Sequence, residues 1–154
     1  MPTLRAIVLD AGPLGLLANA KSSPDSLACH RWVRGHLEAG TEVFIPEITD
    51  YEVRRELIQA RLVKSVAALE ALQGVLDYLV LNTSNMRRAA QLWAEVRQSG
   101  QPTTDRHALD GDVILAAQTL ALGYAAGEVI VATTNAGHLS RFVTAKHWQD
   151  IPTE

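Results

Sequence analysis

The sequence has little cysteine, few aromatic residues and no long hydrophobic run. Cys29 is the only cysteine among 154 residues, which excludes an intramolecular disulfide and a zinc site built from several cysteines. The longest apolar stretch, residues 113–127, includes Gln118 and Gly123 and is too short and too polar to span a membrane. No signal-peptide pattern opens the chain. We therefore expect a cytoplasmic protein with no membrane association.

The motifs of several common enzyme classes are also absent. The chain has no Gly-x-Ser-x-Gly nucleophile elbow and no glycine-rich phosphate loop, and Gly12 and Gly15 do not complete a dinucleotide-binding fingerprint. The histidines show no metal-ligand spacing with acids or with the cysteine. The net charge of −3 gives no general affinity for nucleic acid, although a local basic rim and bound cations can offset acidic site residues.

The chain does have enough apolar residues for a core. They make up 47% of the sequence, and residues 1–154 fit one domain. Short apolar runs alternate with amphipathic segments, which predicts an α/β fold with helices around a mainly parallel sheet. The expected strands cover residues 6–9, 41–45, 78–81 and 128–132, with a last short strand at 148–151. The expected helices cover residues 14–19, 24–38, 48–60, 65–76, 84–98 and 109–122, and a loop covers residues 100–107.

Carboxylates stand at three separate places, each near the start or end of an apolar segment. They are Asp10 after the first expected strand, Glu52 in the third expected helix, and Asp110 with Asp112 beside the last expected helix. In parallel α/β sheets, sites form outside the carboxyl ends of the strands. If the fold brings these groups together, their oxygens form a cage for a hard divalent cation, a common device for phosphodiester hydrolysis.

Each acid also has an ordinary structural interpretation. Asp10 can form a turn before Ala-Gly-Pro, and Glu52 can be a solvated helix residue that pairs with Arg55. Asp110 and Asp112 can cap a helix, although two acids beside one apolar helix exceed what a cap needs. A divalent cation would relieve the mutual repulsion of such clustered acids.

Neighbouring polar residues leave further alternatives open. Glu56 lies one turn after Glu52 and competes with it as the helix-borne ligand, whereas Asp50 can serve as a local turn or cap group. Asn135 follows an expected strand and can either form an Asx turn or orient a carboxylate or a water at the cation. His138 is a weaker candidate, because a histidine in a loop is usually solvated.

Four basic residues follow Glu52 closely in the sequence. They are Arg54, Arg55, Arg61 and Lys64. Each alone is most simply a solvated residue, but together they can receive an RNA backbone beside the acids.

Four segments, taken in order, resemble the PIN-domain ribonucleases, which include the VapC-type toxins of bacterial toxin–antitoxin pairs. They cover residues 8–14, 48–57, 109–117 and 131–139, and so span nearly the whole chain. No single motif is specific, whereas their order and spacing together are fairly specific. The resemblance implies a three-layer α/β/α sandwich, an acidic pocket, dependence on Mg²⁺ or Mn²⁺, and cleavage of single-stranded RNA.

The resemblance also implies roles for individual residues. The family's first Asp, helix Glu, later Asp and fourth polar position match Asp10, Glu52, Asp112 and Asn135. Asp10, Glu52 and Asp112 would then hold the cation, with Asp110 as an additional acid. Asn rather than Asp at position 135 weakens any case for a second tightly bound metal.

We expect the cation to bind the scissile phosphate and activate a water, while Glu52 or Asp110 orients that water or takes its proton. A different interpretation is a catalytically silent PIN-like module that binds RNA or protein. A phosphatase is a third and weaker one, because Gly12 stands where haloacid-dehalogenase phosphatases carry a second Asp. The resemblance further implies a homodimer and, for a toxin, an antitoxin that binds near the site.

Overall fold

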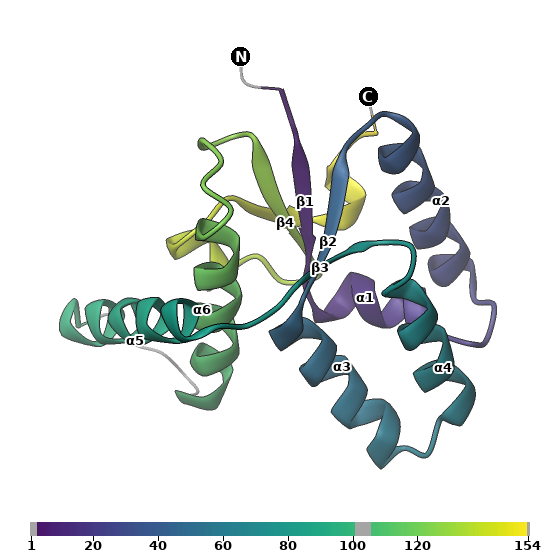
Figure 1. The fold of residues 1–154 in the computed structure, drawn as a ribbon, viewed down its shortest axis with the longest axis horizontal. Helices are drawn as coiled ribbons and strands as arrows, with labels where there is room; N and C mark the ends of the chain where they lie inside the picture. The colour runs from purple at the N-terminus through teal and green to yellow at the C-terminus, as the bar shows by residue number, and fades with distance from the viewer. Residues whose placement is uncertain (1–2, 101–105, 154) are drawn as a thin grey trace.

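The computed structural model describes residues 3–100 and 106–153, and these form one five-stranded parallel sheet with helices packed around it (Figure 1). The strands are β1 (Ala6–Leu9), β2 (Glu42–Pro46), β3 (Asp77–Leu79), β4 (Val129–Thr133) and β5 (Ala145–His147), in the spatial order β3-β2-β1-β4-β5. The helices are α1 (Ala11–Ala18), α2 (Pro24–Glu38), α3 (Glu47–Gln59), α4 (Val63–Leu72), α5 (Thr83–Gln98) and α6 (Arg106–Leu120), with 3₁₀ turns η1 (Leu139–Arg141) and η2 (Trp148–Asp150). The predicted α/β fold with a parallel sheet is confirmed.

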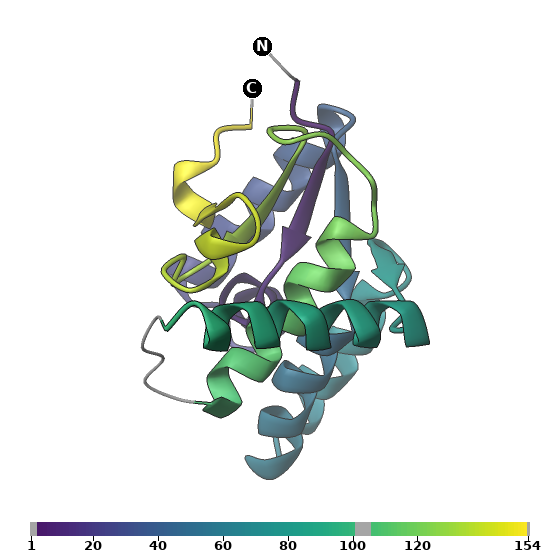
Figure 2. The same cartoon turned by 90° about the vertical axis from the view of Figure 1, so that its left-hand side faces the viewer.

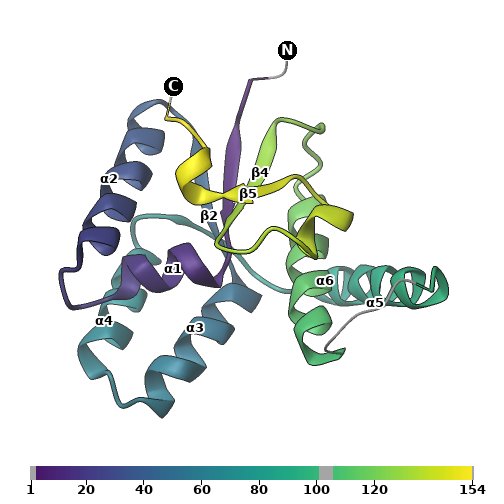
Figure 3. The same ribbon diagram turned by 180° about the vertical axis from the view of Figure 1, so that it is seen from behind.

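The central strand β1 explains why the sheet is covered on both faces. Successive side chains of a strand point to opposite sides. Ile7 and Leu9 pack in one core cluster with α1 and α2, whereas Val8 packs in a second cluster with Leu115 of α6. Helices α1 and α2 accordingly lie on one side of the sheet and α6 on the other, which gives three layers (Figures 1 and 3).

The first two helices show how local sequence sets the boundaries. Helix α2 has the predicted bounds, with Ser23 as N-cap and Pro24 at its first position. Helix α1 begins at Ala11, three residues before the expected start, because Pro13 falls in the first turn, where the missing N–H is not needed.

Asp50 holds α3 against its neighbours, and its expected role as a turn or cap group is wrong. The side chain is buried, and its oxygens accept hydrogen bonds from Tyr78 Oη at 2.7 Å and from Arg54 Nε at 3.0 Å. Arg54 also pairs with Glu70 of α4 at 3.2 Å. This network joins α3, β3 and α4, so α3 is held where it leaves the carboxyl end of β2.

The strand expected at residues 148–151 is wrong. The last strand ends at His147, and residues 148–150 turn away as η2. Trp148 is buried against Trp32 of α2, and Trp32 Nε1 donates a hydrogen bond to the carbonyl of Ile151 at 2.8 Å. Packing of the two indoles therefore draws this segment off the sheet and onto α2.

Helix α6 begins at Arg106, earlier than the expected residue 109, and packs against α5, which crosses it (Figure 2). The loop expected at residues 100–107 is only partly testable, because residues 101–105 lie outside the described residues. Asp110 and Asp112 lie inside α6, so the interpretation that they cap its start is wrong. None of the helices described could cross a membrane.

Candidate functional site

Asp10 lies at the carboxyl end of β1, beside the end of the neighbouring strand β4. Leu9 is in register with Ala132, and Ala132 accepts a hydrogen bond from the Asp10 backbone N–H at 2.9 Å. Asp10 Oδ2 accepts a hydrogen bond from Thr133 Oγ1 at 2.7 Å. The side chain makes no cap bond to α1, although Asp10 occupies the N-cap position. Thr133 of β4 therefore holds the carboxylate, which makes no capping hydrogen bond to α1.

Glu52 reaches from α3 to the same end of the sheet and is half-buried. Its carboxylate lies against α6, where a Cβ placed on Gly111 would come within 2.7 Å of Glu52 Oε2. The pKa of Glu52 is raised from 4.5 to about 7, mainly by burial and also by the negative charges of Asp10 and Asp112, while Arg55 opposes the rise. The interpretation of Glu52 as a solvated helix residue is thus wrong.

Asp112 projects from α6 toward the same acids. Its pKa is raised from 3.8 to about 6, mainly by burial and also by the charge of Asp10. The positive charges of His138 and Arg141, next to and within η1, lower the pKa of Asp112. The structure therefore brings Asp10, Glu52 and Asp112 within electrostatic range of one another at the carboxyl end of the sheet.

Asp110 lies apart from these three acids. Two residues in an α-helix are separated by about 200° around the axis, so Asp110 and Asp112 face nearly opposite directions. Asp110 is exposed and lines a cavity of about 370 Å³ between α5 and α6, with Trp93 and Ile114 among its walls. A catalytic role for Asp110 stays a prediction from the sequence.

Asn135 lies in the exit loop of β4 with its side chain exposed. Its Oδ1 accepts a hydrogen bond from the Gly137 N–H at 3.3 Å, which is the Asx turn that the sequence allowed. Thr133 Oγ1, which binds Asp10, also accepts a hydrogen bond from the Asn135 N–H at 3.0 Å. Asn135 is thus connected to Asp10 through Thr133, and its direct role in chemistry stays a prediction.

Three residues of this site were not predicted as participants. Thr133 holds Asp10, Gly111 gives room for Glu52, and Arg141 places positive charge near Asp112. The Asp-Gly-Asp sequence around Gly111 is a signal that could have been read as a close approach, because glycine lacks the Cβ that would fill that space. No comparable local pattern marks Arg141.

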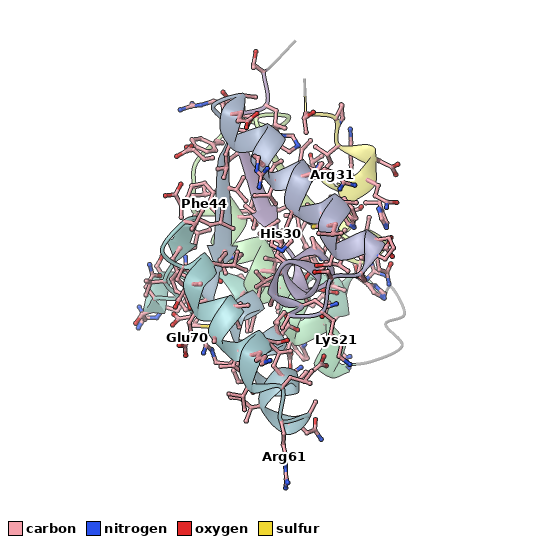
Figure 4. All side chains as sticks on the ribbon, turned by 90° about the vertical axis from the view of Figure 1, so that its right-hand side faces the viewer. Lys21, His30, Arg31, Phe44, Arg61 and Glu70 are labelled. Atoms are coloured by element: carbon pink, nitrogen blue, oxygen red, sulfur yellow. The ribbon has the colours of Figure 1, made fainter. Side chains whose placement is uncertain are left out.

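The predicted basic cluster is divided by the fold. Arg54 is paired with Asp50 and Glu70, and the guanidinium of Arg55 lies 5.1 Å from the centre of the Tyr51 ring. Arg61 projects from the turn between α3 and α4 (Figure 4), and it lines a cavity there together with Lys64. Of these basic residues only Arg55 acts on the pKa of Glu52.

The three acids affect one another electrostatically, but they are not already arranged as a metal site. Among the described residues, no three His, Cys, Asp or Glu side chains are arranged to hold a metal ion. Nor does any salt bridge reach Asp10, Glu52 or Asp112 from side chains that the structure describes. Their negative charges therefore face one another without a neighbouring positive group in contact.

Similar proteins were found by comparison of structures and not by comparison of sequences. No protein-family model matches the sequence, and no curated protein matches it significantly. A chain in the crystal structure of DNA-bound VapBC from Salmonella typhimurium matches with a TM-score of 0.67 and 19% identity, covering 95% of this chain and 99% of that one. A chain in the structure of VapBC2 from Rickettsia felis bound to a promoter DNA fragment matches with a TM-score of 0.68 and 14% identity, over 93% and 98% of the two chains.

A third similar structure is FitAcB from Neisseria gonorrhoeae, with a TM-score of 0.58, 18% identity and coverage of 94% of this chain and 99% of that one. Identities at this level establish the fold and leave the chemistry to the residues themselves. The chain has the PIN-like three-layer fold of these VapBC structures, and the resemblance predicted from the sequence is confirmed for the fold.

Proposed function

We propose that the chain is a divalent-cation-dependent endoribonuclease that hydrolyses phosphodiester bonds of single-stranded RNA. The observation that carries the proposal is the convergence of Asp10, Glu52 and Asp112 at the carboxyl end of a parallel sheet, where Glu52 and Asp112 are half-buried and have raised pKa values. Ligand sites of parallel α/β folds form at this end. Acids whose pKa values are raised by burial and by neighbouring charges are candidates for function.

The residues present fit Mg²⁺ or Mn²⁺. All three groups offer carboxylate oxygens, which hard divalent cations prefer. Gly111 leaves space next to Glu52 Oε2 that a side chain would fill. Because no described trio is preassembled, the carboxylates would have to adjust as a cation binds. Once bound, the cation would supply charge neutralisation at a phosphate oxygen and a lowered pKa for an attacking water.

The chain's own residues have distinct tasks in this proposal. Thr133 Oγ1 donates to Asp10 Oδ2 and so fixes the orientation of that carboxylate. A pKa of Glu52 raised to about 7 suits its carboxylate to accept a proton from water near neutral pH. Arg141 and His138 would bind phosphate oxygens on the side of Asp112.

Specific observations bear on two other candidate functions. The lack of a preassembled ligand group favours the catalytically silent RNA- or protein-binding module as second candidate. A phosphatase with an acid at position 12 is disfavoured, because a Cβ on Gly12 would lie 2.5 Å from side-chain atoms of Thr134. A larger residue at position 12 would require the Thr134 side chain to move.

We further propose an antitoxin protein as partner and a homodimer as the working assembly. Support for the antitoxin comes from the similar structures, which are VapBC complexes. Growth arrest on expression of this chain, relieved by a cognate partner protein, is the expected result. Unimpaired growth at full expression of an active enzyme would count against the toxin role.

The proposed activity is tested by incubating the protein with a panel of single-stranded RNAs, with Mg²⁺, with Mn²⁺ and with EDTA. Cleavage with either cation and none in EDTA is expected, and Asp10→Ala and Asp112→Ala should abolish it. Glu95→Gln, on an exposed site of α5, is the matched control and should cleave normally. Absence of cation-dependent cleavage by the wild type, or full activity of both alanine variants, would reject the proposal in favour of the silent module.

A further inference from the structure

A cavity lies between the C-terminal end of α6 and the segments on either side of β4. Its volume is about 470 Å³, and its walls come from the C-terminal end of α6, the segment that leads into β4, and the stretch from η1 to β5. The η1 turn packs beside α6 (Figure 3). A cavity of this volume is within the range that accommodates small organic ligands.

The chemistry of the cavity walls is specific. Among the described residues that line the cavity, Arg141 is the one with a charged side chain. Tyr124 and Phe142 supply aromatic rings, while Thr144 and Ser140 supply hydroxyl groups. The Tyr124 ring is held in place, because its hydroxyl donates a hydrogen bond to Glu42 and Arg5 lies 4.5 Å from the ring centre. These walls suit a ligand with one anionic group and a planar polar ring.

Arg141 relates this cavity to the helix that carries one of the acids. It lines the cavity and belongs to η1, which packs against α6, the helix that carries Asp112. Asp112 and the cavity residue Thr119 are seven positions apart on α6, or about 10 Å at the helical rise of roughly 1.5 Å per residue. An RNA strand with a phosphate at the acids would reach the cavity within a few nucleotides, at a rise on the order of 3.4 Å each when stacked.

We propose that this cavity is a nucleotide-binding subsite, in which Arg141 binds a phosphate and the cavity walls receive the base of an RNA nucleotide near the scissile bond. A guanidinium matches phosphate geometry through paired hydrogen bonds. Unpaired bases are recognised in proteins by aromatic stacking and by polar groups at their edges. The role in RNA cleavage rests on the proposed ribonuclease function, whereas nucleotide binding does not.

The binding test uses the four nucleoside 5′-monophosphates, AMP, CMP, GMP and UMP, added to the cation-free protein in EDTA and followed by NMR. Arg141→Ala removes the side chain that is proposed to bind the phosphate. Ala126→Phe fills the cavity from an exposed wall position. Arg31→Ala is the matched control, because Arg31 is exposed on the outer side of α2 (Figure 4). The thermal stability of every variant is recorded, so that loss of binding is not confused with loss of fold.

We expect at least one nucleotide to shift resonances of the cavity residues saturably in the wild type and in Arg31→Ala. Arg141→Ala and Ala126→Phe should each weaken that binding about tenfold or more, as expected for loss of a charged hydrogen bond or of base contacts. Wild-type affinity in both cavity variants, shifts that map elsewhere, or no binding of any nucleotide would overturn the inference.

A cleavage assay on the same variants separates this inference from the proposed function. If the wild type cleaves RNA in a cation-dependent way, Ala126→Phe should raise KM with little change in kcat. Unchanged KM in Ala126→Phe would reject the subsite while the ribonuclease proposal stands. Nucleotide binding in the cavity of a protein that cleaves no RNA would reject the ribonuclease proposal and keep the binding site.

Discussion

Acidic residues at the two ends of the sheet have different surroundings. At the amino end, Glu42 accepts a hydrogen bond from the Tyr124 hydroxyl, and Glu128 pairs with Arg5 at 3.6 Å. At the carboxyl end, Glu52 and Asp112 face other acids and are partly buried, with raised pKa values. Acids with ion-pair or hydrogen-bond partners contribute to the fold, whereas half-buried acids gathered without ion-pair partners are candidates for a functional site.

The largest expected effect lies at the carboxyl end. Asp112→Asn should lower RNA cleavage by more than about 100-fold, because loss of a direct ligand should exceed the 10- to 100-fold effects of residues that only orient ligands. The fold should persist, as judged by circular dichroism. Glu42→Gln, the matched change at the amino end, should leave cleavage unchanged. Equal losses in the two variants would remove the contrast between the two ends.

Gly111 offers a second way to sharpen the contrast. Gly111→Ala should reduce cleavage by on the order of tenfold or more, because the new Cβ would come within 2.7 Å of Glu52 Oε2 and displace that carboxylate. The stability should change little, since alanine favours a helix over glycine by up to about 1 kcal/mol and offsets the local strain. Steady-state cleavage and thermal unfolding measure the two effects. Gly74→Ala is the control, because it makes the same substitution at a glycine outside the site.

The pH dependence of stability should distinguish the carboxyl end without any assay of activity. The pKa of Glu52 is raised from 4.5 to about 7, so its protonated form favours the folded state. That contribution is fully present below pH 4.5 and is lost as the pH rises through 7. Glu52→Gln mimics the protonated form at every pH. In EDTA its Tm should match the wild type near pH 4.5 and exceed it above pH 7, by on the order of a few degrees.

Thermal scans of the wild type and Glu52→Gln at several pH values provide the measurement. A Tm difference that shrinks as the pH rises would contradict the assignment of Glu52 as a destabilised acid.

The smallest expected effect lies at the amino end. Glu42→Gln replaces a charged acceptor of the Tyr124 hydroxyl by a neutral one and should lower the free energy of unfolding by about 0.5–1.5 kcal/mol. Denaturant titration at neutral pH measures this change. A stability gain in Glu42→Gln like that expected for Glu52→Gln would show that the two ends do not differ.

The features that the sequence predicted best depend on short-range patterns. The strand at residues 6–9 and the helix at 24–38 have the expected bounds, because an apolar run and a Ser-Pro start specify them locally. The convergence of Asp10, Glu52 and Asp112 was also expected, since parallel strands end at one edge and the resemblance matched the same residues. Their roles with a cation stay predictions.

The features that it missed depend on contacts between distant segments. For Asp50 the sequence suggested a local turn or cap role, yet its partner Tyr78 lies 28 residues away and its burial becomes visible only in the fold. Trp148 was expected in a strand, but packing against Trp32 directs the chain elsewhere. Asp110 and Asp112 were treated together, although their spacing places them on nearly opposite sides of a helix whose start lies before both.

Binding of Mn²⁺, measured by isothermal titration calorimetry at pH 7.5, addresses the function of the acids most directly. The wild type and Glu95→Gln should both show saturable binding, and Asp112→Asn should lose it. Identical titrations of all three proteins, or no binding by the folded wild type, would contradict the proposal that Asp10, Glu52 and Asp112 form a cation site.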